Sequence, residues 1–159
     1  MNRLFPLLFC VGLLASASGM AQASNLPYDD RADAAADVRN ALHEASAAKK
    51  DVLLIFGANW CPDCRLLDSV LHGKAAEQLA GRFVLVKVSV GDFDKNLELA
   101  KRYDVPLRKG IPAAVVLSSD DRRLYTTQAG ELANAHRMGE SEIVQFFSRI
   151  ADNTARQPR

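Results

Sequence analysis

Cysteine and tryptophan are scarce in this chain, which has 159 residues, three cysteines and one tryptophan. So few cysteines exclude a small domain stapled by several disulfides, and a chain of this length can bury a core without them. The sequence also lacks a second C-x-x-C pair and its histidines are scattered, whereas a structural zinc site normally takes four ligands. We therefore predict one folded domain with no metal site.

A block of basic residues is missing as well. The chain has 20 lysines and arginines against 19 aspartates and glutamates, which gives a formal charge of +1. Domains that bind nucleic acid present clustered basic side chains. The sequence therefore predicts no nucleic-acid partner.

The apolar run at the start of the chain is too short to cross a bilayer comfortably, which takes about 20 residues. This run, residues 4–14, follows a short positive start at Arg3, and small residues come after it, with Ala21 and Ala23 in an A-x-A arrangement. The pattern is typical of a secretory signal peptide. We predict cleavage after Ala23, export, and location in the bacterial periplasm.

Cleavage would remove Cys10 and leave Cys61 and Cys64, an even number that suits an oxidising compartment. The predicted division of the chain is a signal peptide at 1–23, an N-terminal linker at 24–29, a folded domain at 30–151 and a flexible tail at 152–159.

Hydrophobic periodicity predicts helices that alternate with strands. Such alternation favours a parallel core of βαβ units, to which a turn at 119–121 adds an antiparallel edge pair. We predict an α/β fold with a mixed central sheet of about four to five strands, flanked by helices on both faces. The first predicted helix begins near residue 30, and three more span 61–80, 94–105 and 140–150. The predicted strands span 51–58, 82–90, 112–119 and 122–130.

The motif WCPDC lies where the apolar strand 51–58 meets the next helix. Pro62 suits the first helical turn, which places Cys61 beside the free N–H groups and the positive dipole end of that helix. This environment favours the thiolate, which is the nucleophile. Cys64 follows one turn later on the face directed at the sheet. We predict an exposed, activated Cys61 and a buried Cys64, an arrangement suited to attack and resolution through a mixed disulfide.

Three simpler roles for the cysteine pair compete with this prediction. A structural staple would stabilise little, because closing so short a loop removes little chain entropy. The two thiols could instead belong to a metal carrier, or the two residues could be inert cysteines of the core. The position between strand and helix, together with Pro62, favours a redox pair over all three.

The chain resembles the thioredoxin family from about residue 30 to residue 151, in the segments LLIFGANWCPDC, KGIPAAVVL and YTTQAG and in a final helix. The resemblance implies a thioredoxin-like fold and a thiol–disulfide oxidoreductase. It also implies that Cys61 and Cys64 are the catalytic pair and that no cofactor is needed beyond their redox-active disulfide.

The resemblance further assigns residues around the pair. In the family, a cis proline lies beside the cysteines, and Ile111-Pro112 matches it. The backbone just before that proline pairs with an extended substrate segment, so Ile111 and Pro112 are expected to bind substrate. Trp60 matches the tryptophan before the first cysteine and is expected to cover the site. Pro62 and Asp63, between the cysteines, are expected to tune the redox potential.

Two features distinguish the chain from thioredoxin itself: Ile55, and the pair Pro62-Asp63 between the cysteines, where thioredoxin has Gly-Pro. Ile55 stands where thioredoxins keep a buried aspartate, so water, another group or the substrate must deprotonate Cys64. Asp63 and Arg65 exert opposed effects of about 1 kcal/mol or less, whereas redox potentials in the family span about 7 kcal/mol. Simple charge arguments therefore leave the direction of electron flow open.

The lack of a histidine between the cysteines, and of an added helical domain, favours a reductase of protein or small-molecule disulfides. Such a protein would receive electrons from a membrane thiol-reducing partner. Two rival functions stay open: an oxidase or isomerase with the same pair, and a non-enzymatic metal-binding or interaction module. In the thioredoxin family the loop after the position of Gly130 lies near the cysteines, which would let His136 and Arg137 meet substrate. For the segment 131–140 we favour a solvated loop.

Overall fold

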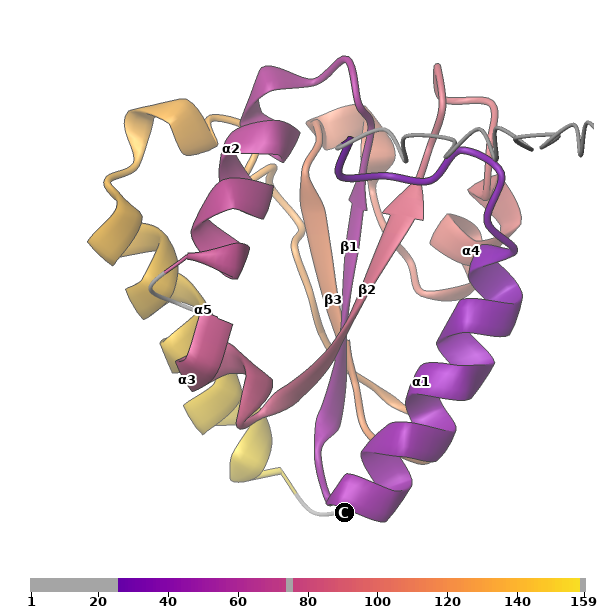
Figure 1. The fold of residues 1–159 in the computed structure, drawn as a ribbon, viewed down its shortest axis with the longest axis vertical. Helices are drawn as coiled ribbons and strands as arrows, with labels where there is room; N and C mark the ends of the chain where they lie inside the picture. Colours follow the sequence, from indigo (N-terminus) through magenta and orange to yellow (C-terminus); the bar gives the residue numbers. More distant parts are fainter. Residues whose placement is uncertain (1–25, 74–75, 158–159) are drawn as a thin grey trace, which may run out of the picture.

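A computed structural model describes residues 26–73 and 76–157, so the predicted signal peptide lies outside the described residues. Four strands form one sheet in the order β2-β1-β3-β4 (Figure 1). Only β1 and β2 run parallel, while β1 with β3 and β3 with β4 are antiparallel. The strands are β1 (Asp51–Gly57), β2 (Phe83–Ser89), β3 (Ala113–Leu117) and β4 (Arg123–Thr126).

The direction of β3 corrects the prediction of a parallel core. Ala113, the first residue of β3, pairs with Phe56 near the end of β1. The chain therefore enters β3 at the end of the sheet where β1 finishes, and only β1 and β2 form a βαβ unit. This reversal brings Pro112 to the edge where Cys61 lies.

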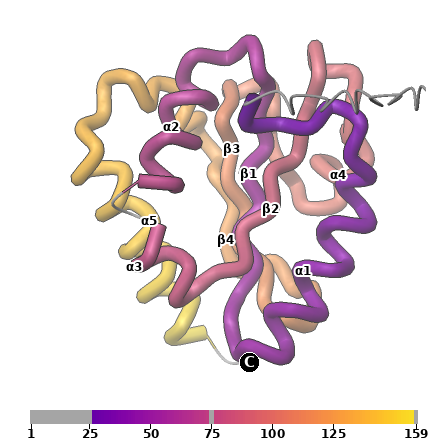
Figure 2. The backbone as a smooth tube through the Cα atoms, in the orientation of Figure 1, coloured from indigo at the N-terminus to yellow at the C-terminus, as the bar shows by residue number. Residues whose placement is uncertain are grey.

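Helices cover both faces of the sheet, as predicted (Figures 1 and 2). One face carries α1 and α4, and the other carries α2, α3 and α5. The helices are α1 (Ala34–Ala48), α2 (Pro62–His72), α3 (Ala76–Ala80), α4 (Leu97–Arg102) and α5 (Glu140–Ala155), with short 3-10 helices η1 (Leu107–Lys109) and η2 (Ala135–Arg137).

The central strand β1 supplies both hydrophobic cores, because successive side chains of a strand point to opposite faces. Val52, Leu54 and Phe56 pack into the core beneath α1. Leu53 and Ile55 pack into the core beneath α2 and α5. All five side chains are buried, which explains the continuous apolar run and fixes the strand between the two helical layers.

The predicted helix at 61–80 is broken into α2 and α3. Gly73 follows α2, and its N–H bonds to the carbonyl of Val70, so a glycine ends the helix. The first helix begins at Ala34 rather than near residue 30, because the Asp33 side chain accepts a hydrogen bond from the Ala36 N–H and caps it.

The predicted flexible tail is wrong for its first residues. Helix α5 continues to Ala155, and the side chains of Ala151 and Thr154 are buried. The predicted linker at 24–29 is likewise more than a spacer, because Tyr28 within it is 3% exposed. The packed domain therefore extends beyond 30–151 at both ends.

Candidate active site

The cysteine pair lies at the start of α2, directly after β1. Cys61 is the N-cap residue of the helix, with extended backbone, and Pro62 is its first helical residue. The Cys61 sulfur accepts a hydrogen bond of 3.1 Å from the Cys64 N–H. A disulfide joins Cys61 to Cys64. The sequence-based placement at a helix N-terminus thus matches the structure.

The exposure of the first cysteine corrects the sequence-based prediction. Cys64 is fully buried, as expected, but Cys61 is only 4% exposed. Its sulfur is bonded to Cys64 and lies 3.6 Å from the Ile111 carbonyl oxygen, so the facing loop closes over it. In the disulfide form, only a small part of Cys61 reaches solvent.

The loop before β3 faces the cysteines. The peptide bond between Ile111 and Pro112 is cis, and both residues are buried. Since the Ile111 carbonyl lies beside the Cys61 sulfur, the sequence-distant Ile-Pro pair and the cysteines form one local surface.

Trp60 is half exposed beside this surface. Its indole N–H donates a hydrogen bond of 2.9 Å to the Gly91 carbonyl, and its ring lies 5.8 Å from that of Phe93. Phe93 is 43% exposed and has a φ of 64°. Phe93 cannot be predicted as a site residue from the sequence, because nothing in its local pattern indicates that the loop after β2 returns to Trp60. The two rings form an exposed aromatic shelf next to the disulfide.

Asp63 contacts His136, which lies 73 positions later in the chain. Its Oδ1 accepts a 2.7 Å hydrogen bond from the His136 backbone N–H and lies 2.7 Å from His136 Nδ1. The Asp63 side chain is 14% exposed. His136 is exposed, as predicted for a solvated segment, and its ring and backbone also contact Asp63 in the turn between the cysteines.

An acidic residue lies one helical turn after Cys64. Asp68 forms an ion pair with Lys87 of β2, and its Oδ1 lies 3.2 Å from His72 Nδ1. Lys87 lies opposite Ile55 in the strand register. The position that thioredoxins fill with a strand aspartate is therefore apolar here, and the nearby carboxylate comes from the helix.

The segment before α1 also reaches the site. The Tyr28 N–H donates to the Asn59 side-chain oxygen at 3.0 Å, and the Asn59 amide donates back to the Tyr28 carbonyl at 2.8 Å. Burial raises the pKa of the Tyr28 hydroxyl well above its usual range, and the negative charge of Asp68 raises it further. The segment from 26 to 33 is thus anchored just before the WCPDC motif.

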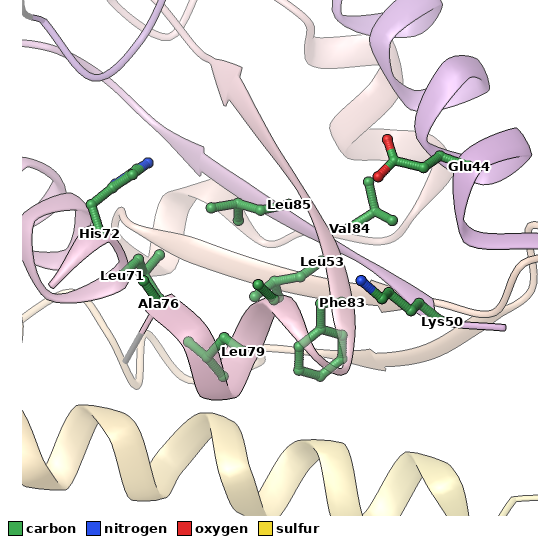
Figure 3. Close-up of a pocket in the computed structure, with 11 residues that line it drawn as sticks. Glu44, Lys50, Leu53, Leu71, His72, Ala76, Leu79, Phe83, Val84 and Leu85 are labelled. Carbon is green, nitrogen blue, oxygen red and sulfur yellow. The ribbon is translucent and has the colours of Figure 1, made fainter. Parts of the chain in front are cut away.

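A cavity of about 380 Å³ lies elsewhere, between the end of α2, α3 and β2 (Figure 3). Leu71, Leu79 and Phe83 are among its lining residues, and none of the predicted site residues lines it. The described residues contain no group of three or more histidine, cysteine or acidic side chains able to hold a metal ion. None of the helices in the described ranges has the length and apolar character needed to cross a membrane.

Known proteins share this architecture. The family model described as thioredoxin-like matches residues 33–119. A thioredoxin of Buchnera aphidicola subsp. Baizongia pistaciae (strain Bp) is 30% identical over 86 residues, which cover 54% of this chain and 71% of that protein.

Solved structures give the same result. A crystal structure of disulphide isomerase from Xylella fastidiosa Temecula1 is 50% identical, with a TM-score of 0.77, and the match covers 80% of this chain and 98% of that one. The C-terminal domain of DsbD from Neisseria meningitidis, in its oxidised form, shares the fold at 18% identity, with a TM-score of 0.52 over 74% of this chain and 96% of that one. Together with the disulfide at the start of α2, these matches show that the chain belongs to the thioredoxin-like family of thiol–disulfide oxidoreductases.

Proposed function

We propose that the protein is an exported reductase of protein disulfides, in which Cys61 attacks the substrate and Cys64 resolves the intermediate. The observation that carries this assignment is the place of Cys61 at the N-cap of α2, where its sulfur accepts the Cys64 N–H. An N–H donor and the positive end of a helix both stabilise a thiolate. These two interactions therefore stabilise the thiolate form of Cys61, which is the nucleophile.

The reaction follows from the order of the two sulfurs. The Cys61 thiolate attacks one substrate sulfur, and the substrate disulfide breaks with its electron pair on the other sulfur, which leaves as a thiolate. The Cys64 thiolate then attacks the Cys61 sulfur, forms the Cys61–Cys64 disulfide and releases the second substrate thiolate. Two electrons pass from the protein to the substrate. A dithiol partner, which we expect in the membrane, must restore the reduced pair.

Substrate would dock across the surface that surrounds Cys61. The backbone at Ile111 would pair with an extended segment of the substrate, with Pro112 shaping that edge. The half-exposed Trp60 offers an apolar face at its border. Pro62 and Asp63 would set the redox potential of the pair through the first turn of α2.

Single serine variants test this division of labour. Cys61→Ser should abolish reduction of insulin disulfides, because no nucleophile reaches the substrate. Cys64→Ser should accumulate a mixed disulfide between Cys61 and the substrate, visible on non-reducing gels and removed by dithiothreitol. Normal turnover by Cys64→Ser would show that the proposed resolving step is wrong.

An isomerase is a second candidate, favoured by the 50% identical Xylella protein described as a disulphide isomerase. Isomerisation can proceed with Cys61 alone, because a thiol of the substrate can resolve the mixed disulfide. Reactivation of scrambled ribonuclease by Cys64→Ser, without net reduction, would favour the isomerase. Stoichiometric binding of copper or zinc by the reduced protein, with neither activity, would favour the metal-binding module.

Export has its own test. The mature N-terminus of the protein purified from the periplasmic fraction of an exporting bacterium should be Ser24, which mass spectrometry of the intact chain can establish. Full-length protein confined to the cytoplasmic fraction would contradict the proposed signal peptide.

A further inference from the structure

The hydroxyl group of Tyr28 lies near Gly57 and the buried sulfur of Cys64. A Cβ atom added to Gly57, the last residue of β1, would lie 2.2 Å from Tyr28 Oη and 3.0 Å from Cys64 Sγ. The hydroxyl and the buried sulfur therefore border the same small space, which exists because Gly57 has no side chain. Neither part of this arrangement is apparent in the sequence, where Tyr28 precedes the cysteines by a whole helix and strand.

The position of the tyrosine is held by several contacts. Asn59 exchanges two hydrogen bonds with the Tyr28 backbone. Asp30, two residues later, accepts from the Ser89 hydroxyl, and its carbonyl accepts from the Lys95 side chain. With 3% of its surface exposed, Tyr28 is a fixed component of the site rather than part of a loose N-terminal segment.

The tyrosine hydroxyl keeps its proton and can therefore donate a hydrogen bond. Burial, and to a smaller extent the charge of Asp68, raise the pKa of its hydroxyl. Asp68 is itself held beside the site by Lys87 and His72. The proton therefore stays on the Tyr28 oxygen throughout the range in which thiols titrate.

We infer that the Tyr28 hydroxyl donates a hydrogen bond to the Cys64 thiolate and stabilises it, an inference that rests on the proposed roles of the two cysteines. When a reducing thiolate attacks the Cys61 sulfur, the Cys61–Cys64 bond breaks and its electron pair stays on the Cys64 sulfur. The tyrosine would meet this new negative charge without giving up its proton. Solvent protonates the released thiolate in a later step.

The chemistry of the two redox states explains why the contact forms on reduction. A disulfide sulfur is neutral and a weak acceptor. Within the described residues, no hydrogen bond joins Tyr28 to Cys64 in the disulfide form. A thiolate is charged, and hydrogen bonds to charged acceptors are shorter and stronger. A hydrogen bond from Tyr28 would thus favour the deprotonated form of Cys64, whereas the apolar side chain of Ile55 cannot assist its deprotonation.

The decisive measurement is the pKa of Cys64 in a Cys61→Ser background, followed by the Cβ chemical shift of Cys64 against pH. Tyr28→Phe keeps the ring and removes only the hydroxyl. We expect the Cys64 pKa to rise by about one pH unit or more, because a hydrogen bond to a charged group contributes at least that much. The matched control is Tyr125→Phe, a half-buried tyrosine on β4, which should leave this pKa unchanged.

An unchanged Cys64 pKa in Tyr28→Phe, or an equal change in Tyr125→Phe, would overturn the inference. Should Tyr28→Phe fail to fold, fluorotyrosine at position 28 replaces it: the more acidic phenol is a stronger donor, so the Cys64 pKa should fall, and no fall would overturn the inference. The titration uses no disulfide substrate. It therefore decides the role of Tyr28 even if the reductase assay fails.

Discussion

The two hydrogen bonds between Asn59 and Tyr28 allow a quantitative test of how the N-terminal segment is held. Asn59→Ala removes both bonds, of 3.0 Å and 2.8 Å, in a partly buried position. A net contribution of about 1 kcal/mol for each bond predicts a loss of about 2 kcal/mol in the free energy of unfolding. With a urea dependence of about 1–3 kcal/mol per molar, the unfolding midpoint should fall by about 1 M.

The assay is urea unfolding of the oxidised protein, followed by circular dichroism so that the signal does not depend on Trp60 beside the mutated residue. The control is Asn153→Ala, an exposed position on α5, which should change the free energy of unfolding by about 0.5 kcal/mol or less. An unchanged midpoint in Asn59→Ala, or an equal fall in the control, would refute the view that Asn59 anchors the segment.

Three further predictions concern the site and its surroundings. Gly57→Ala should destabilise the protein by about 1–3 kcal/mol in the same urea assay, because the added Cβ would overlap Tyr28 Oη; unchanged stability would contradict the packing described. Asp63→Asn removes a negative charge beside the Cys61 thiolate, so the reduction potential measured against glutathione should rise by about 20 mV, the equivalent of about 1 kcal/mol; a fall would contradict that sign. Burial raises the pKa of Glu131, but backbone N–H groups including that of Gln128 lower it by more, so its folded-state pKa is below its unfolded value. Glu131→Gln should therefore destabilise the protein at neutral pH, and the difference in stability from wild type should shrink below about pH 4. A difference that grows in acid would contradict this sign.

Local sequence patterns are sufficient to predict the sheet, its two helical layers and the cysteine pair. The apolar run of β1 and the placement of Pro62 carry that information within a few neighbouring residues. The direction of β3 cannot be predicted in this way, because it depends on where the preceding connection returns the chain. That return is visible only in the pairing of Ala113 with Phe56.

Some site residues cannot be predicted from the sequence for the same reason: their contacts join distant segments of the chain. Tyr28 and Asn59 are 31 positions apart, and Asp63 and His136 are 73 positions apart. No periodicity connects such pairs, so the sequence predicts a linker around the buried tyrosine and does not predict the contact between Asp63 and the exposed His136. The sequence also overestimates the exposure of Cys61, because the covering carbonyl of Ile111 comes from a distant segment.

The aromatic shelf of Trp60 and Phe93 draws its outer ring from the connection between β2 and α4, a stretch of chain that contributes no sulfur and no part of the cis-proline loop. Substitution of Phe93 alone would therefore change the apolar border of the proposed docking surface and keep the residues that hold the two sulfurs. Exchanging Phe93 for the side chain of a relative, with Gly91 and Lys95 retained because they bind Trp60 and the segment of Tyr28, offers a route to separate the choice of partner from the redox potential.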